Sequence, residues 1–415
     1  MIKKLIILLF PFYCNAATYY ISPSGSDGGS GAIGSPWFTF NKAWTVLAAG
    51  DFLYCRGGTY NYTVQQDITS LSGSSGNLIT IENYPGEVPI FTQDNSYPVD
   101  GQDLFIFAGS YFLFKGLQIF DCDETTLDWA AFRSEGCSNV TFENILYSYN
   151  QLGFTVRECN NILFLNCDFY YNEDAAGDNA DGLNITYISN GSYSNTVRGC
   201  RAFNNSDDGF DFWANEGYVL IENSWSWHNG YRQNGTTEAG DGSGFKFGQY
   251  TAAPTSTLKR TARECVSYDN KLWGFNENNC QTRIDLYNNT AYDNGTGGTG
   301  KNYWFGDWGN HVMNVTNNIH YVAPEGYTFN GASIVETTNS WQVATVTDAD
   351  FQSLSGTLGN PRQSNGSLPD ITFLHLAASS DMRGVGTEVC CGTDLGAFQY
   401  SSEVFGRYKL RKQAL

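Results

Sequence analysis

The sequence predicts an all-β protein, a parallel β-helix in which short strands wind into a stack of coils. The composition supports this fold, because the 415 residues include 45 Gly and 15% aromatic residues and few helix-forming runs. A repeat of about 30 residues also recurs along the chain, and periods of this length are typical of solenoids. Length alone would suggest two or three domains, whereas the repeat indicates one elongated unit.

The repeat is clearest where two segments align without a gap. "VRGCRAFNNSDDGFDF" (197–212) matches "ARECVSYDNKLWGFNE" (262–277), with Cys, Asn and a Gly–Phe pair at the same positions. Each copy has alternating apolar residues, an Asn-rich bend and a glycine before an apolar residue. These glycines are Gly153, Gly182, Gly209, Gly244 and Gly274. One such unit cannot bury its apolar face alone, whereas stacked copies can.

Stacking places equivalent residues of successive coils above one another, and alternation along each strand sends every second side chain inward. We therefore expect an interior ladder of amides and a neighbouring column of thiols. The amides are Asn144, Asn166, Asn223 and Asn288; the thiols are Cys167, Cys200 and Cys265. Both columns are expected to be structural rather than functional.

Both ends of the repeat region have features of their own. Residues 35–51 are predicted to form a short amphipathic helix, with Ser35 and Pro36 at its start and Gly50 at its end. A helix there would cover the strand edges of the first coil. We assign residues 17–345 to the β-helix and residues 346–415, where the repeat fades, to an irregular C-terminal tail packed on it.

The chain is predicted to be exported. Met1–Ala16 has two lysines, an apolar segment and small residues before a cleavage point after Ala16, as signal peptides do. No other apolar run approaches the ~20 residues of a membrane span. The formal charge is −19, or −21 once Lys3 and Lys4 are removed, and this balance disfavours nucleic acid as a partner. We expect a secreted monomer, extracellular or periplasmic, without a membrane anchor.

Cysteine usage fits an exported chain. Of the 11 cysteines, all but Cys14 would remain after cleavage, and export permits disulfides. The adjacent Cys390 and Cys391 are the two that we expect to be oxidised or paired elsewhere, with the connectivity left open.

The repeat also brings carboxylates together. The residue before the shared glycine is Asp181 in one copy and Asp208 in the next, and two residues after it Asp211 is followed by Lys246. If the chain bends at Asp208, four aspartates including Asp207 converge from two adjacent coils. Ca2+ accepts about 6–8 oxygen ligands in flexible geometry and would relieve the repulsion between them. An Asx-rich turn with solvated acids is the alternative.

Lys246, in "GSGFKFG" (242–248), has two interpretations. It is an ion-pair partner of Asp211, or it is a Brønsted base, because lysine changes pKa readily when it is partly buried or near cations. Four aspartates would raise its pKa, so a bound cation has to offset them before the neutral amine forms. The base interpretation therefore predicts metal dependence and an alkaline pH optimum.

These segments resemble family nine of the polysaccharide lyases, which are pectate lyases with a right-handed parallel β-helix. The resemblance covers most of the chain and rests on "NADG" (179–182), "RGCRAFNNSDDGFDFW" (198–213), "IENSWSWHNG" (221–230), "GSGFKFG" (242–248) and "LYNNTAYDN" (286–294), in this order. It implies that Asp181, Asp207, Asp208 and Asp211 bind Ca2+ and that Lys246 is the catalytic base. The implied reaction is β-elimination on an acidic polysaccharide, with pectate as the expected substrate.

Two regions depart from the family pattern, namely the stretch after "NADG" and the insertion 231–241, and both would line the groove. Arg232 and Lys271, in bends near the site, are weaker candidates for binding substrate carboxylates. Ordinary surface charge is the alternative for each of them.

Two other functions fit parts of the sequence. A β-helix glycoside hydrolase of the polygalacturonase type would use a carboxylate acid and base. The Gly-His-Gly and Arg-Ile-Lys segments expected of it do not occur, and the four histidines are scattered. A non-catalytic carbohydrate-binding or adhesin β-helix would use exposed aromatic side chains, but it has no need of Lys246.

Overall fold

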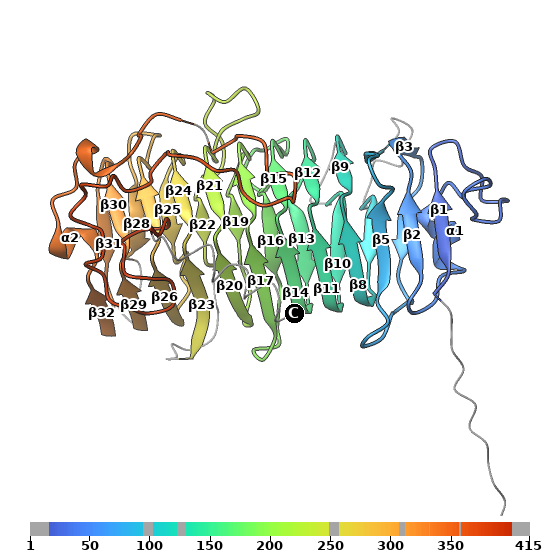
Figure 1. The fold of residues 1–415 in the computed structure, drawn as a ribbon, viewed down its shortest axis with the longest axis horizontal. Coiled ribbons are helices and arrows are strands. Elements are labelled where there is room, and N and C mark those ends of the chain that lie inside the picture. The colour runs from blue at the N-terminus through green and yellow to red at the C-terminus, as the bar shows by residue number, and fades with distance from the viewer. Residues whose placement is uncertain are drawn as a thin grey trace, which may run out of the picture.

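Short strands are the main regular elements of the computed structural model, which describes residues 16–93, 103–122, 130–248, 257–306, 312–331, 333–356 and 358–400. The strands form three parallel sheets of 12, 10 and 10 strands that run the length of an elongated molecule (Figure 1). The predicted signal peptide lies outside the described residues except for Ala16. None of the described helices has the length or the apolar character that crossing a bilayer demands. The predicted all-β solenoid is confirmed.

Each sheet collects one kind of strand from successive coils. The first sheet contains β1 (Thr18–Ile21), β2 (Phe52–Cys55), β5 (Ile79–Asn83), β8 (Ser110–Lys115), β11 (Ser138–Glu143), β14 (Asn160–Leu165), β17 (Ser194–Arg198), β20 (Tyr218–Glu222), β23 (Leu258–Arg263), β26 (Arg283–Tyr287), β29 (Val312–Thr316) and β32 (Ser333–Thr337). The second contains β4 (Gln66–Ile68), β7 (Phe105–Phe107), β10 (Phe132–Glu135), β13 (Phe154–Arg157), β16 (Leu183–Thr186), β19 (Phe210–Asp211), β22 (Phe245–Lys246), β25 (Trp273–Asn276), β28 (Lys301–Phe305) and β31 (Tyr327–Phe329). The third contains β3 (Gly58–Tyr62), β6 (Pro89–Gln93), β9 (Gln118–Phe120), β12 (Leu146–Ser148), β15 (Asp168–Tyr170), β18 (Arg201–Phe203), β21 (Trp225–Trp227), β24 (Val266–Tyr268), β27 (Thr290–Tyr292) and β30 (Ile319–Tyr321).

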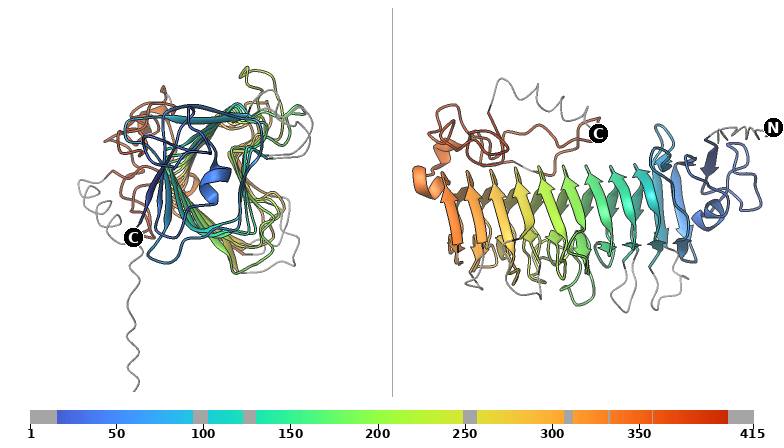
Figure 2. Two further views of the ribbon diagram at one scale, coloured as in Figure 1. Left: turned by 90° about the vertical axis from the view of Figure 1, so that its right-hand side faces the viewer. Right: turned by 90° about the horizontal axis from the view of Figure 1, so that it is seen from below.

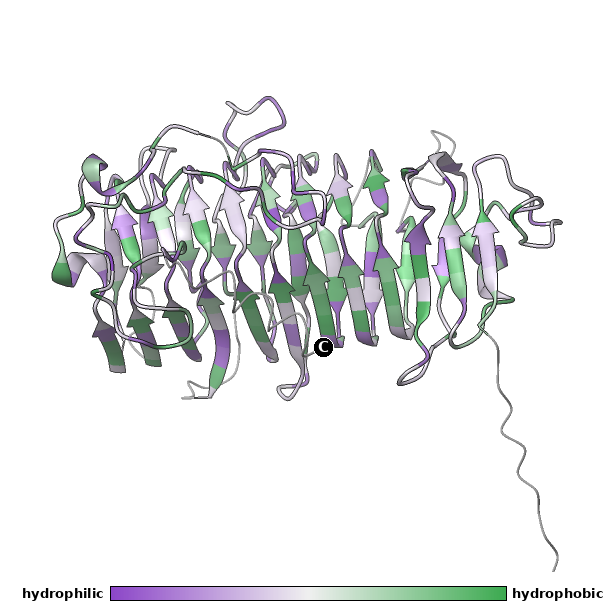
Figure 3. Ribbon diagram, in the orientation of Figure 1, coloured by the Kyte–Doolittle hydropathy of each residue, from purple (hydrophilic) through white to green (hydrophobic). Residues whose placement is uncertain are grey.

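The interior of the coils is filled by side chains that stack from one coil to the next. In the second sheet, Phe210 pairs in register with Leu183 on one side and Phe245 on the other. Phe210, Phe245 and Phe275 are fully buried, and their successive ring centroids lie 5.3 and 4.6 Å apart. Figure 3 shows the apolar and polar bands that share the strands. Because neighbouring residues point to opposite faces, this pattern separates an aromatic interior from a polar outer face.

The helix that covers the first coil is shorter than predicted. Helix α1 spans Phe40–Trp44 rather than residues 35–51, and Thr39 caps it by accepting a hydrogen bond from the backbone N–H of Lys42. The residues at the predicted start of the helix have an extended backbone instead, because Trp37 pairs with β1. Seen along the long axis, α1 lies across the end of the coil (Figure 2, left). Its place is therefore as expected, whereas its length is not.

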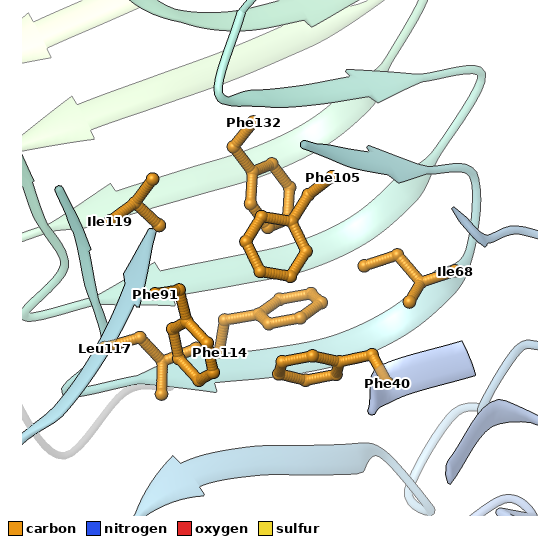
Figure 4. Close-up of a pocket in the computed structure, with 8 residues that line it drawn as sticks. All are labelled: Phe40, Ile68, Phe91, Phe105, Phe114, Leu117, Ile119 and Phe132. Atoms are coloured by element: carbon orange, nitrogen blue, oxygen red, sulfur yellow. The ribbon is translucent and has the colours of Figure 1, made fainter. Parts of the chain in front are cut away.

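Phe40 carries α1 into the interior of the first coils. Its ring packs against Phe91 and Phe105, with centroids 5.3 and 5.4 Å away. Eight apolar residues, Phe40 among them, surround a void of about 10 Å³ (Figure 4). A void this small and this apolar is a packing gap that holds neither water nor ligand.

A ladder of buried amides runs through one corner of the coils, at a different position from the one predicted. Its members are Asn150, Asn172, Asn205, Asn229, Asn270, Asn294 and Asn302. The side-chain oxygen of every member after Asn150 accepts the backbone N–H of the preceding member at 3.1–3.2 Å. From Asn172 onward, each side-chain amide also donates to the next oxygen at 2.8–3.0 Å. The ladder therefore satisfies backbone groups that would otherwise be buried without partners.

The predicted ladder position has another role, and that interpretation was wrong. Asn144, Asn166, Asn223 and Asn288 have φ values of 52°, 56°, 47° and 51°, each at the corner that follows a strand of the first sheet. Asparagine is among the few non-glycine residues that adopt this left-handed conformation readily. The recurrence of Asn at these positions therefore reflects a backbone requirement rather than an interior network.

The predicted thiol column is confirmed with one interruption. The backbone N–H of Cys167 donates to the sulfur of Cys200, and that of Cys200 donates to the hydroxyl of Ser224, which stands before Cys265 in the column. These three cysteines are buried and free. In the tail, Cys390 and Cys391 form a disulfide with each other.

The described part of the tail runs back along the third sheet (Figure 1). It follows α2 (Ser340–Val343) and the 3-10 helix η1 (Asp348–Asp350), and its apolar residues pack on Trp225 and other outward side chains of that sheet. Asp168 of β15 anchors it, because Arg201 and the tail residue Arg362 each lie 2.6 Å from its carboxylate. The described part of the tail thus packs against the third sheet between β15 and β30.

Replacing Asn229 with alanine is expected to destabilise the protein by about 2–3 kcal/mol. The change removes the oxygen that accepts two hydrogen bonds from Asn205 and the donor to Asn270, so buried polar groups lose their partners. The measurement is the melting temperature. The control is Asn314→Ala on an outer strand face, where the side chain makes one contact at 3.5 Å and little change is expected. Equal melting temperatures for the two variants would contradict a stabilising role for the ladder.

Candidate functional site

Five of the predicted site residues meet on the outer face of the second sheet, at β16, β19 and β22, near the middle of the molecule (Figure 1). In register, Asp211 of β19 pairs with Asn184 on one side and Lys246 on the other. The next strand places Asn276 beside Lys246. This order confirms the column predicted from the repeat.

A bend before β19 brings both Asp207 and Asp208 into the cluster. The chain turns at Ser206 and Asp207 and enters the strand after Gly209. A Cβ at Gly209 would lie 2.1 Å from the hydroxyl oxygen of Ser226 and 2.7 Å from a backbone oxygen of the next coil. Glycine is therefore required for the coils to approach closely at this point. The backbone N–H of Asp208 donates to Oδ1 of Asp181 at 2.9 Å, which joins the two coils.

The carboxylates are close together and shielded from water. Asp181, Asp207 and Asp208 each offer an oxygen within 4.8 Å of the others. All four aspartates are buried, because the exposed fractions of Asp181, Asp207, Asp208 and Asp211 are 5%, 5%, 0% and 7%. Buried like charges this close are stable only with a proton or a cation among them.

Lys246 supplies one positive charge to the cluster. Its Nζ lies 2.7 Å from Oδ2 of Asp208 and 3.5 Å from Oδ2 of Asp211. It is 8% exposed and also lies 3.4 Å from Oδ2 of Asp241, an exposed residue of the loop before β22. The amine therefore stands at the edge between the buried carboxylates and solvent.

The electrostatics of the cluster follow from burial and crowding. Burial, followed by the charges of neighbouring aspartates, raises the pKa of Asp181 and of Asp207 well above the usual range. Burial also raises the pKa of Asp208, and it raises the pKa of Asp211 to about 6, although the charge of Lys246 opposes both shifts.

The pKa of Lys246 is decided by two opposing effects. Burial lowers it, but the charges of the four aspartates together outweigh burial and place the pKa well above that of an ordinary lysine. The carboxylates on their own therefore hold the amine in its protonated form. The direction is the one predicted from the sequence, in which the four aspartates raise the pKa of Lys246.

The donor set fits a hard divalent cation. All the clustered ligand atoms are carboxylate oxygens, which Ca2+ prefers. Oδ2 of Asp208 is buried, and its one cationic neighbour among the described residues is the amine of Lys246 at 2.7 Å. A single lysine does not balance four carboxylates, so the cluster has both the charge and the oxygen atoms to hold such an ion.

Asp241 is a site residue that the sequence did not predict. Besides its contact with Lys246, its backbone N–H donates to Oδ1 of Asp207. It belongs to the insertion 231–241, which has no equivalent in the other repeats. The signal available in the sequence was an acid five residues before Lys246. The repeat could not place it, because its loop has no equivalent in another copy with which to align.

The other two predicted residues serve the loops around the cluster. Arg232 donates to Glu173 at 3.0 Å and to backbone carbonyls of residues 174–176. Lys271 donates to the backbone carbonyls of Ala239 and Gly240. Both cations are thus engaged by protein acceptors, and their assignment to substrate stays a prediction.

Comparisons with known proteins agree with this fold. Residues 19–317 match the family model described as "Pel9A-like, right handed beta helix region". The chain is 30% identical over 407 residues to pectate lyase L of Dickeya chrysanthemi, covering 92% of this chain and 90% of that protein. It is 30% identical to pectate lyase PEL9 of Emericella nidulans, covering 80% and 85%.

Two solved structures are similar over nearly their full length. The crystal structure of pectate lyase Pel9A matches with a TM-score of 0.76 and 27% identity, over 93% of this chain and 96% of that one. A rhamnogalacturonan lyase matches with a TM-score of 0.79 and 30% identity, over 88% and 97%. The right-handed sense of the coils follows from this likeness.

Proposed function

Because the chain belongs to the Pel9A-like right-handed β-helix family and is a pectate lyase-like polysaccharide lyase, we propose that it cleaves a uronic-acid polymer by Ca2+-assisted β-elimination. Polygalacturonate is the substrate that we favour. We further propose that Lys246 is the base, and that the protein is exported, given the features of Met1–Ala16.

The observation that carries this proposal is the position of Lys246. It stands in register beside Asp211, touches Asp208, and faces outward at the edge of the only carboxylate cluster of this kind among the described residues. A purely structural ion pair has no need of four buried aspartates around one lysine. A Brønsted base does need them, because a cation bound by the aspartates would offset their charge and so allow Lys246 to become neutral.

The aspartates Asp181, Asp207, Asp208 and Asp211 would hold the cation. A bound Ca2+ would neutralise the C6 carboxylate of the substrate and make the C5 proton more acidic. This neutralisation would also allow a chain of charge −19 to accept a polyanion at this face.

Lys246 then removes the C5 proton, which it holds on Nζ. The electron pair left at C5 forms the C4–C5 double bond, the C4–O bond breaks, and the departing oxygen takes a proton from solvent. Asp208 and Asp211 position the amine through their contacts with it. Burial of the carboxylates keeps bulk water from screening these interactions.

Rhamnogalacturonan is a second candidate substrate, because the similar structure with a TM-score of 0.79 is a rhamnogalacturonan lyase. A hydrolytic mechanism would use a carboxylate acid and base and has no need of the lysine that lies among the aspartates here, so the position of Lys246 favours elimination.

Incubation with polygalacturonate and Ca2+ is expected to produce ultraviolet-absorbing unsaturated ends, and a chelator is expected to lower the rate at least about 100-fold. Restoring Ca2+ should restore the rate. Rhamnogalacturonan, tested in parallel, separates the two candidate substrates. New reducing ends without ultraviolet absorbance would indicate hydrolysis and overturn the proposal, and an unchanged rate in chelator would remove the role of the cation.

A further inference from the structure

Arg157 is a cation on the outer face of the second sheet that forms no ion pair or hydrogen bond with an acid among the described residues. It ends β13, directly after the buried Val156, so alternation turns its side chain outward. Its Nε is buried and makes no hydrogen bond. Guanidinium groups in such positions are usually paired with carboxylates, so the free one needs an explanation.

The acids nearest to Arg157 are engaged elsewhere. Glu135 is its register partner in β10, yet the Glu135 carboxylate lies 3.7 Å from Arg133. Asp103 forms its ion pair with Arg133, at 2.8 Å, and the charge of Arg157 acts on it only more weakly, without a contact. Glu158 accepts the backbone N–H of Ser189 at 3.0 Å. Arg157 is therefore left available to an anion from outside the described chain.

Two exposed aromatic rings extend the surface beside Arg157. Its Cζ lies 4.9 Å from the centroid of the Tyr187 ring, and that ring meets Trp213 edge to face at 5.1 Å. Tyr187 is 48% and Trp213 36% exposed. Exposed rings beside a free guanidinium match the chemistry of a sugar with a carboxylate, because the rings contact its apolar face and the guanidinium binds the anion.

The three residues lie close to the aspartate cluster but do not belong to it. Tyr187 directly follows β16 and Trp213 follows β19, whose Asp211 accepts the backbone N–H of Trp213 at 2.8 Å. Arg157 stands three coils from Lys246, because β13, β16, β19 and β22 are successive neighbours. At ~4.8 Å per coil the backbones of Arg157 and Lys246 are roughly 14 Å apart, which is more than the length of one sugar ring.

We propose that Arg157, Tyr187 and Trp213 form a subsite for a uronic-acid unit of the substrate chain, distinct from the unit that reacts at Lys246. Arg157 binds the carboxylate, and the two rings pack against the sugar. The inference rests on the proposed function for its substrate class. It also gives this strongly acidic protein a second means of binding a polyanion, one that needs no metal.

The test compares Arg157→Gln with the wild type on polygalacturonate. We expect KM to rise about 10-fold with kcat unchanged, because Arg157 contributes a charge-assisted hydrogen bond but does not touch the reacting atoms. Arg157→Lys should recover part of the loss. Lys115→Gln is the matched control, since Lys115 is an outer-face cation of the first sheet that pairs with Glu143, and its KM should stay at the wild-type value.

Retardation in gels containing polygalacturonate separates this inference from the proposed function. Retarded wild type and weakly retarded Arg157→Gln would support the subsite even if the wild type made no unsaturated product. If Arg157→Gln matched the wild type in both KM and retardation, the subsite would be overturned while the lyase function stood. A loss of kcat with an unchanged KM, or equal losses on polygalacturonate and fully methyl-esterified pectin, would also overturn it.

Discussion

Replacing Lys246 with arginine is expected to lower kcat on polygalacturonate by about 10³-fold, with a melting temperature close to that of the wild type. Arginine keeps a positive charge beside Asp208 and Asp211, so the buried carboxylates keep a partner. Its guanidinium is not deprotonated in proteins and cannot accept the C5 proton. General bases contribute about 10²–10⁴-fold to rates. The rate of ultraviolet absorbance at saturating Ca2+ and thermal unfolding are the two measurements.

This substitution distinguishes the two interpretations of Lys246, because it removes the base and retains the ion pair. Lys246→Ala should be equally inactive but should also unfold at a lower temperature, since it leaves the buried aspartates without the amine. Lys115→Arg is the control for a lysine-to-arginine change on the coils, and full activity is expected. An Lys246→Arg variant with the kcat of the wild type would make the residue an ion-pair partner and would remove the proposed mechanism.

The column through Asp211 and Lys246 could be predicted because a parallel β-helix turns sequence alignment into spatial pairing. When Gly209 is aligned with Gly244, residues two positions later become register partners, and the structure pairs them. No side-chain detail is needed for this step. The bend that admits Asp208 follows from the same alignment, since Gly209 allows the coils to approach closely.

Alternation could not predict the corners, where side-chain direction depends on φ rather than on strand periodicity. Asn204 has a φ of 56°, whereas its neighbour Asn205 is fully buried and belongs to the amide ladder. Two asparagines next to each other thus have different roles, and composition does not separate them. Asp241 escaped prediction for another reason. Its loop is positioned by contacts such as that of the Gly240 N–H with the carbonyl of Gly177, residues far apart in sequence.

Replacing Asp181 with asparagine is expected to have opposite effects on stability and on function. In chelator, the variant should melt a few degrees above the wild type, because a buried carboxylate surrounded by others opposes folding. Oδ1 of the new amide can still accept the N–H of Asp208, so the local structure is retained. With Ca2+, the same change removes one of four anionic ligands, and activity should fall by about 10²–10³-fold at a fixed subsaturating concentration.

The calcium dependence of the melting temperature tests the cation site apart from catalysis. A ligand that binds only the folded state stabilises it in proportion to the logarithm of its concentration over Kd, so a ~100-fold weaker site needs ~100-fold more Ca2+ for the same shift. Asp178→Asn is the matched control, because Asp178 is an exposed acid of the same loop that bonds only Asn179, and its response should follow the wild type. Equal calcium responses of Asp181→Asn and the wild type would show that Asp181 is not a ligand. A variant less stable than the wild type in chelator would show that the carboxylate stabilises the fold, in which case its burial needs no cation to account for it.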